Sequence, residues 1–325
     1  MASAPVAVSA SPFSWPKRPV VNRIFSSLFS GEGAIRGVPF ILTATVFFCI
    51  SDAASKYLAT DGINAIQIAW VRYLIFVAIV VPIALFQVGF KGLKTHHPVQ
   101  QVVRGVFMVL STILFVSGLA YLDVADATAI NFVSPVFITA LAIPILGEKV
   151  GLRRWTAALV GLMGVMIIVQ PGSDAFQLAA LFPIGAAAVW AGAAIATRIM
   201  SATETPQATL VYSSSVGFLV LCALVPFFWT SLTLEQFGVG VITGVASAIA
   251  HLMFVLAYRH ASATVLAPFS YTQIVWASII GFLVFGSVPG VWTYVGGAII
   301  AASGLYTAHR ERLKSRALRT TKSAH

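Results

Sequence analysis

The sequence predicts an all-α integral membrane protein that crosses the bilayer ten times. Of its 325 residues, 58% are apolar and only 9% are charged, and the mean hydropathy is +0.92. A soluble domain carries about 25% charged residues, so most of this surface must face lipid rather than water. Both cysteines lie inside apolar runs, and the sequence therefore indicates no disulfide framework.

A helix that spans a bilayer needs about 20 mostly apolar residues. Runs of this kind, separated by turn residues, predict spans at 38–59, 65–89, 102–121, 125–147, 153–170, 177–200, 207–229, 237–258, 263–286 and 290–309. The third and fourth runs, and the ninth and tenth, are joined so tightly that nine spans is an alternative on length alone.

The distribution of charge favours ten spans. Lys and Arg accumulate in short cytoplasmic loops, and with both termini inside, all of the 20 Lys and Arg residues except Lys56 and Arg72 fall on one side. The opposite loops hold the acidic residues Asp61, Asp123, Asp126, Asp174 and Glu235. An odd number of spans would spoil this separation. We therefore expect a multi-pass protein of a bacterial-type inner membrane with both termini cytoplasmic, and the basic composition needs no nucleic-acid partner.

An internal repeat divides the chain. Ala-Asp-Ala-Thr at 125–128 opens the fourth span and Ala-Ser-Ala-Thr at 261–264 opens the ninth, and each is followed at the same offset by a serine, Ser134 or Ser270. Two five-helix repeats are thus predicted. Because five is odd, the second repeat must be inverted relative to the first, an architecture that recurs in secondary transporters with a central site.

The predicted units are a cytoplasmic N-terminal tail at 1–36, repeats at 37–171 and 177–309, and a basic cytoplasmic tail at 310–325. The Ser/Ala/Pro-rich N-terminal tail is predicted to be mostly disordered. Apolar residues at helical spacing within it, at 21–29, leave open a short helix on the inner leaflet.

Several segments resemble a known family. They are Asp52-Ala53-Ala54-Ser55-Lys56, Trp70-Val71-Arg72-Tyr73, Arg104-Gly105, residues 125–130 through Leu146-Gly147-Glu148, residues 267–273 and residues 302–306. In order and spacing they resemble the EamA branch of the drug/metabolite transporter (DMT) superfamily over roughly 37–309, and most closely its S-adenosylmethionine and riboflavin uptake members. The resemblance implies ten helices, two inverted repeats and a central solute cavity. Gly286-Ser287 stands where the second repeat often carries Gly-Glu, so no role for that Glu is carried over.

Three ionisable residues inside spans are candidate site residues, because a charge there costs about 2.5–3.5 kcal/mol on insertion scales. Asp52 and Arg72 lie at matching depths, about 10 Å and about 11–12 Å from the outer ends of their helices. Lys56 lies one turn from Asp52 on the same face. We expect the three to form a buried cluster with one spare positive charge. Such a cluster is either a structural salt bridge or a site for an anionic solute.

Five further residues are candidates for binding or gating. His251 could titrate or hydrogen-bond a solute, or could be a neutral histidine bonded to a backbone carbonyl. Asn131, Tyr271 and Gln273 lie inside the fourth and ninth spans beside Pro135 and Pro268, which permit local helix breaks. Trp190 could stack on a planar solute or simply pack.

The motifs present exclude several classes of function. The sequence has no pattern typical of an enzyme's catalytic centre, no metal-ligand pair and no Walker A motif. We therefore expect no cofactor and no metal, and a secondary transporter that moves a small organic metabolite, anionic or planar, by alternating access with proton or exchange coupling. Monomer and homodimer both remain open. The alternative is a lipid-translocating or scaffold protein with a groove that opens sideways to lipid.

Overall fold

The computed structural model describes residues 37–147, 152–171, 177–201, 203–261, 266 and 269–322, and the side chains of these residues except 152–154 and 307–322. The helices of this part are α2 (Gly37–Thr60), α3 (Ala65–Gly92), α4 (Pro98–Leu119), α5 (Val124–Asn131), α6 (Ser134–Leu146), α7 (Leu152–Val169), η2 (Leu178–Ala180), α8 (Leu181–Met200), α9 (Pro206–Leu224), η3 (Val225–Phe227), α10 (Leu234–His260), α12 (Thr272–Phe285) and α13 (Val291–Lys322). The described residues contain no strand.

The described helices account for the ten predicted spans. Seven are long and apolar enough to cross a membrane, with α5 and α6 counted as one span. Three shorter apolar helices, Trp155–Val169, Thr272–Phe285 and Val291–Tyr306, complete the set. The protein is therefore a multi-pass, all-α membrane protein, as its composition predicts.

The helix ends follow local sequence signals. Pro98 sits in the first turn of α4, where a missing N–H costs nothing, so α4 begins four residues before the predicted span. Asn64, Thr205 and Thr233 cap α3, α9 and α10 through their side-chain oxygens. The last helix differs most from the prediction, because α13 continues to Lys322, through most of the predicted tail. The tentative helix at 21–29 lies outside the described residues.

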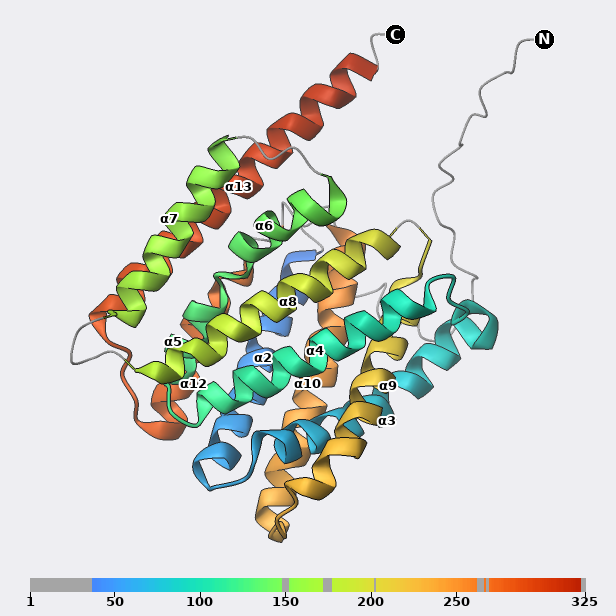
Figure 1. Cartoon of the computed structure of the whole chain (residues 1–325), viewed down its shortest axis with the longest axis vertical. Helices are drawn as coiled ribbons and strands as arrows, with labels where there is room; N and C mark the ends of the chain where they lie inside the picture. The colour runs from blue at the N-terminus through green and yellow to red at the C-terminus, as the bar shows by residue number, and fades with distance from the viewer. Residues whose placement is uncertain are drawn as a thin grey trace.

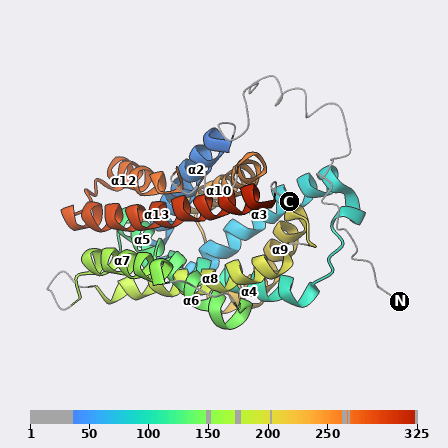
Figure 2. The ribbon, with the colours of Figure 1, turned by 90° about the horizontal axis from the view of Figure 1, so that it is seen from above.

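The two repeats pack with two-fold exchange symmetry. α2 packs on α10 as α4 packs on α8, and α2 packs on α12 as α6 packs on α8, while α3 meets α9 and α7 meets α13. Exchanging the first five spans for the second five reproduces this set of contacts. Figure 2 shows the resulting layers, with α2, α10 and α12 on one side and α4, α6 and α8 on the other. Each layer thus combines helices from both repeats.

Equivalent details recur in the two halves. Gly147 ends α6 and Gly286 ends α12, both in the left-handed conformation that glycine adopts without strain, with φ of 65° and 67°. Gln236 at the start of α10 donates to Asp61 at one end of the bundle. At the other end, Gln101 at the start of α4 donates to Glu204 (3.4 Å). The end that carries Asp61 is called outer below and the end that carries Glu204 inner, following the orientation that the charges predict.

α7 and α13 form a separate flank of the bundle, opposite α3 and α9 (Figure 1). Their backbones meet at two glycines, since a Cβ added to Gly164 would lie 2.7 Å from the carbonyl oxygen of Gly296. Small residues allow such close approach between membrane helices. α7 and α13 are therefore tightly packed on each other, and both also pack on α5 at one side of the bundle.

The predicted orientation can be tested by cysteine accessibility. In a background with Cys49 and Cys222 replaced by Ser, we expect a membrane-impermeant thiol reagent added outside intact cells to label Asp61→Cys and Glu235→Cys. Lys94→Cys should be labelled only after permeabilisation. All three side chains are exposed, so accessibility reports the side of the membrane rather than burial. Labelling of Lys94→Cys in intact cells would show that the protein has the opposite orientation in the membrane.

Candidate functional site

The fourth span of each repeat is interrupted at mid-depth. α5 ends at Asn131 and α6 starts at Ser134, immediately before Pro135. In the second repeat, residues 269–270 are helical, Tyr271 is a turn and α12 starts at Thr272. The break in the fourth span thus occurs where Pro135 permits it. Interrupted backbone is tolerated at membrane depth only where protein or a water-filled cavity satisfies its polar groups, so these breaks indicate a site.

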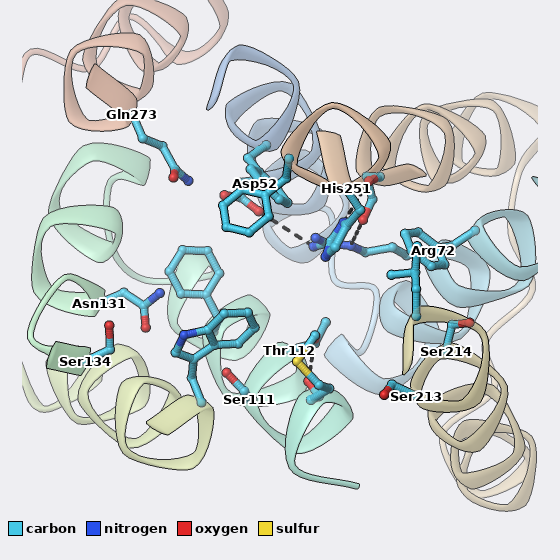
Figure 3. A pocket seen from close by; sticks show the side chains of 18 of the residues that line it. Asp52, Arg72, Ser111, Thr112, Asn131, Ser134, Ser213, Ser214, His251 and Gln273 are labelled. Carbon is cyan, nitrogen blue, oxygen red and sulfur yellow. Dashed lines mark hydrogen bonds and ion pairs between the residues drawn. The ribbon is translucent and has the colours of Figure 1, made fainter. Parts of the chain in front are cut away.

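A cavity of about 340 Å³ lies between the two layers, at these breaks (Figure 3). This volume is within the range of about 300–1,000 Å³ that is typical of small-molecule sites. Its described lining comes from α2, α3, α4, α5, α6, α8, α9, α10 and α12, with Phe132 after α5 and Ser270 before α12, and includes no residue of α7 or α13. Both repeats therefore contribute to one central cavity.

The cavity reaches toward the inner end only. Tyr258, two residues before the end of α10, and Arg104, in the second turn of α4, both line it. Toward the outer end the lining stops near Asp52 and Phe115. Beyond them the helices are closed by the buried side chains of Leu58, Ile63, Ile68 and Val116. The structure is thus sealed on the outer side of the cavity.

Asp52 and Arg72 form the expected buried ion pair. Arg72 Nη1 lies 3.6 Å from Asp52 Oδ1, and the two residues are 5% and 9% exposed. Arg72 Nε also donates to Ser247 Oγ (3.1 Å). Gly244 makes this contact possible, because a Cβ there would lie 3.0 Å from the Arg72 carbonyl oxygen, and α3 and α10 could not pack so closely. Both charges line the cavity.

Lys56 does not belong to this cluster, which corrects the prediction of one spare positive charge beside Asp52. Its Nζ lies 3.0 Å from Asp123 Oδ1 and donates to the Leu122 carbonyl oxygen (2.7 Å). It also lies 5.3 Å from the ring centroid of Phe285. The reason is topological: Asp123 begins the fourth span at the outer end, one helical turn above the Asp52 level. Lys56 therefore joins α2, α5 and α12 outside the cavity lining.

Arg104 is a cavity residue that sequence reasoning missed. From the sequence, Arg104 was assigned to the basic residues at the inner end of the spans, because the third span was expected to start at residue 102. Since α4 begins at Pro98, Arg104 instead faces the cavity. Its Nε donates to Thr197 Oγ1 (2.7 Å) and its Nη1 donates to Ser213 Oγ. The signal available in the sequence was Pro98 itself, a residue that favours the first turn of a helix.

His251 lines the cavity between two aromatic rings. Its Nδ1 lies 2.8 Å from the Ser247 carbonyl oxygen, which assigns the proton to Nδ1 in the neutral ring. The rings of Phe48 and Phe76 meet it edge-on, at centroid distances of 4.9 and 5.0 Å. This geometry matches the interpretation of a histidine bonded to a backbone carbonyl, and leaves its second ring nitrogen available for other contacts.

The remaining candidates separate into two groups. Asn131, Gln273 and Trp190 line the cavity, and Trp190 is 37% exposed. Tyr271 is not part of its lining. Its ring packs 5.0 Å from the ring of Phe132 and against the core instead, because Tyr271 is the turn residue that precedes α12.

Two lining residues carry polar atoms that lack a partner. Thr128 Oγ1 and Asn131 Oδ1 are buried side-chain oxygens without a hydrogen bond within the described part of the chain. A buried polar group left unpaired costs about 1–3 kcal/mol. The described residues also contain no group of three or more His, Cys, Asp or Glu side chains that could hold a metal ion. The chemistry of the cavity is therefore that of ion pairs, hydroxyls, carboxamides and aromatic rings.

A central cavity that is closed at the outer end and lies between two interleaved five-span repeats is the architecture of a secondary transporter. The model of the EamA-like transporter family matches residues 35–170 and 177–307, one match for each repeat. The chain therefore belongs to the EamA-like transporter family. This assignment agrees with the resemblance found in the sequence and with the expectation of a transporter rather than an enzyme.

Named relatives cover nearly the whole chain. A riboflavin transporter of Vibrio cholerae is 31% identical over 290 residues, which are 87% of this chain and 96% of that protein. An S-adenosylmethionine uptake transporter of Rickettsia prowazekii is 27% identical over 280 residues, 86% of this chain and 94% of that protein. A crystal structure that is 17% identical matches with a TM-score of 0.60 over 85% of this chain and 98% of that chain, which supports the fold.

The Asp52–Arg72 pair predicts a measurable loss of stability. Asp52→Asn leaves the buried Arg72 cation without its counter-charge, and breaking one side of a buried pair typically costs about 3–5 kcal/mol. We expect a clear fall in the melting temperature of the purified protein. The double variant Asp52→Arg with Arg72→Asp should recover part of the loss. A melting temperature unchanged in Asp52→Asn would show that the pair carries no such stability.

Proposed function

We propose that this protein is a secondary transporter of the bacterial inner membrane that moves a planar heteroaromatic metabolite of the flavin kind. The observation that carries the proposal is the central cavity, which combines aromatic walls with few charges. Energy would come from an ion gradient, from exchange or from the gradient of the solute itself. The polar groups within this lining, which lies between the two layers, favour a solute over a lipid.

The shape and composition of the lining support a planar solute. Aromatic side chains surround the cavity on both layers: Phe48, Tyr73, Phe76, Phe115, Phe132, Trp190, Phe254 and Tyr258. Aromatic rings stack favourably on flat conjugated rings, by about 0.5–1.5 kcal/mol beyond the burial of area. A sugar or a small aliphatic acid would use little of this surface.

The charge of the lining favours a neutral or anionic solute. The charged lining residues in the described part are Asp52, Arg72 and Arg104. Asp52 is paired with Arg72, whereas the hydrogen-bond acceptors of Arg104 are hydroxyl and carbonyl oxygens. The excess positive charge opposes a cationic sulfonium such as S-adenosylmethionine. The same charge is compatible with riboflavin, whose ring system is neutral. The charge of the lining therefore favours the solute of the Vibrio relative over that of the Rickettsia relative.

We further propose that transport proceeds by alternating access, with Lys56 as part of the outer gate. Lys56 joins α2 to the start of α5 and to the end of α12. Gln67 and Thr230 add hydrogen bonds of 2.7, 2.9 and 3.0 Å at the same end. These contacts must separate for the cavity to open outward. The inner-facing cavity and the sealed outer end support an inward-facing state.

The substrate proposal can be tested by flux into proteoliposomes. We expect saturable riboflavin transport that S-adenosylmethionine does not inhibit. Trp190→Ala should weaken riboflavin affinity up to about tenfold, because it removes a stacking surface. Trp292→Ala is the matched control, since Trp292 is exposed and is not among the lining residues. Inhibition by S-adenosylmethionine with no riboflavin flux would contradict the proposal.

The gate proposal can be tested with a cysteine in the cavity. In the cysteine-free background, Ser111→Cys should react slowly with an impermeant reagent applied to the outer side. Adding Lys56→Met removes the ion pair, which at its half-exposed Asp123 end is worth about 1 kcal/mol, and should speed labelling about fivefold. The exchanged pair Lys56→Asp with Asp123→Lys should restore slow labelling. An unchanged rate in Lys56→Met would remove Lys56 from the gate.

A further inference from the structure

The α5 wall of the cavity carries two buried side-chain oxygens that have no partner. Thr128 and Asn131 both line the cavity, and Thr128 is only 3% exposed. Thr128 Oγ1 and Asn131 Oδ1 make no hydrogen bond to any described residue. The two residues are three positions apart on one helix, so their side chains share a face. Because both residues line the cavity, a solute bound there is the partner that these oxygens can acquire.

Three other hydroxyl groups of the cavity donate to backbone carbonyl oxygens. Ser111 donates to the Ala186 carbonyl oxygen (2.9 Å), and Thr112 donates to the Met108 carbonyl oxygen (2.9 Å). Ser214 donates to the Val211 carbonyl oxygen (3.0 Å). Among the lining residues that the structure describes, buried oxygens without a partner occur only at Thr128 and Asn131. Among the buried oxygens of the lining, those still lacking a partner therefore both lie on α5.

These groups define the chemistry of the complementary ligand. A carboxamide presents an acceptor oxygen and an NH₂ donor side by side, and a hydroxyl can act either way. Asparagine uses the same pair to bind the paired donor and acceptor on the edge of adenine. An N–H next to a C=O in one ring, as in a lactam or an imide, offers the same kind of paired edge. In Figure 3, Asn131 points into the cavity, with Gln273 of the neighbouring α12 on the same side and Arg72 on the opposite side.

The surrounding walls favour a flat ring with this edge. Phe132, the next residue after Asn131, and Trp190 line the same cavity. Aromatic faces bind the plane of a conjugated ring, whereas the polar α5 groups can bind only at its rim. The two kinds of contact together would hold the ring in one orientation.

We propose that Thr128 and Asn131 form the specificity subsite of the transporter and bind the N–H/C=O edge of a lactam or imide ring. This inference rests on the proposed function in that the solute is a planar heteroaromatic compound. It identifies which atoms of that compound are recognised. A ring that lacks a free N–H at this edge binds the cavity less tightly.

The test compares matched probes on protein in lipid nanodiscs by isothermal titration calorimetry. The first pair is riboflavin and N3-methylriboflavin, and the second is hypoxanthine and its N1-methyl derivative. We expect wild-type protein to bind the N–H form of at least one pair about tenfold more tightly. Asn131→Leu and the near-isosteric Thr128→Val should each reduce this ratio toward one. Gln207→Leu is the matched control, because it removes another unpartnered buried carboxamide that is not among the lining residues, and it should keep the ratio.

The outcomes separate the subsite from the proposed function. A preference in the hypoxanthine pair alone, lost in both α5 variants, supports the subsite and removes riboflavin as the solute. Tight and equal binding of riboflavin and its methyl derivative, without a preference in the hypoxanthine pair, supports a flavin solute and overturns the subsite. The subsite is also overturned if neither pair shows a preference, or if the preference survives in both α5 variants. A variant that fails to fold leaves the other α5 variant to decide.

Discussion

The structure depends on one constraint, which is that backbone polar groups inside a bilayer must be satisfied without water. Unbroken helices meet it throughout α2, α4 and α10. In the fourth and ninth spans the helix is interrupted at mid-depth, and the cavity lies at both interruptions. Irregular backbone is permitted there because protein from both repeats encloses it. The cavity there is lined by polar groups of both repeats. The position of the site is therefore a consequence of how the fold meets its solvent.

The exchange of helices between the layers gives the cavity its mixed character. Each layer holds helices of both repeats, so the ion pair Asp52–Arg72 lies against Ser247 of the second repeat, and Arg104 of the first repeat lies against Ser213 of the second. Neither repeat could form these contacts alone. The Arg72 and Arg104 guanidinium groups are thus positioned by hydroxyl groups of the second repeat, which add no further charge to the bilayer interior.

Much of the fold could be predicted from the sequence, because bilayer thickness fixes the length of apolar runs and basic residues mark one side. The pairing of Asp52 with Arg72 also followed, since depth along two adjacent helices is simple arithmetic. The partner of Lys56 did not. Sequence spacing gives the depth and face of Lys56 on its own helix, but Asp123 reaches it from a span that is distant along the chain. Arg104 was missed for a smaller reason: the helix start was misplaced by four residues, which put Arg104 at the inner end of its span instead of in the cavity. Thr128 had no signal, because nothing in a sequence reveals which hydroxyl will lack a partner.

The close approach of α7 and α13 has a mechanical consequence. Their backbones touch at Gly164 and Gly296, where no side chain intervenes to deform or slide. In the alternating-access mechanism proposed above, a rearrangement that preserves this contact can rotate about it. Displacement then grows with distance from that flank and is greatest at α3 and α9, on the far side of the bundle. Arg72 and Ser213 lie on α3 and α9, so such a rotation would displace the charged wall of the cavity farther than the two glycines.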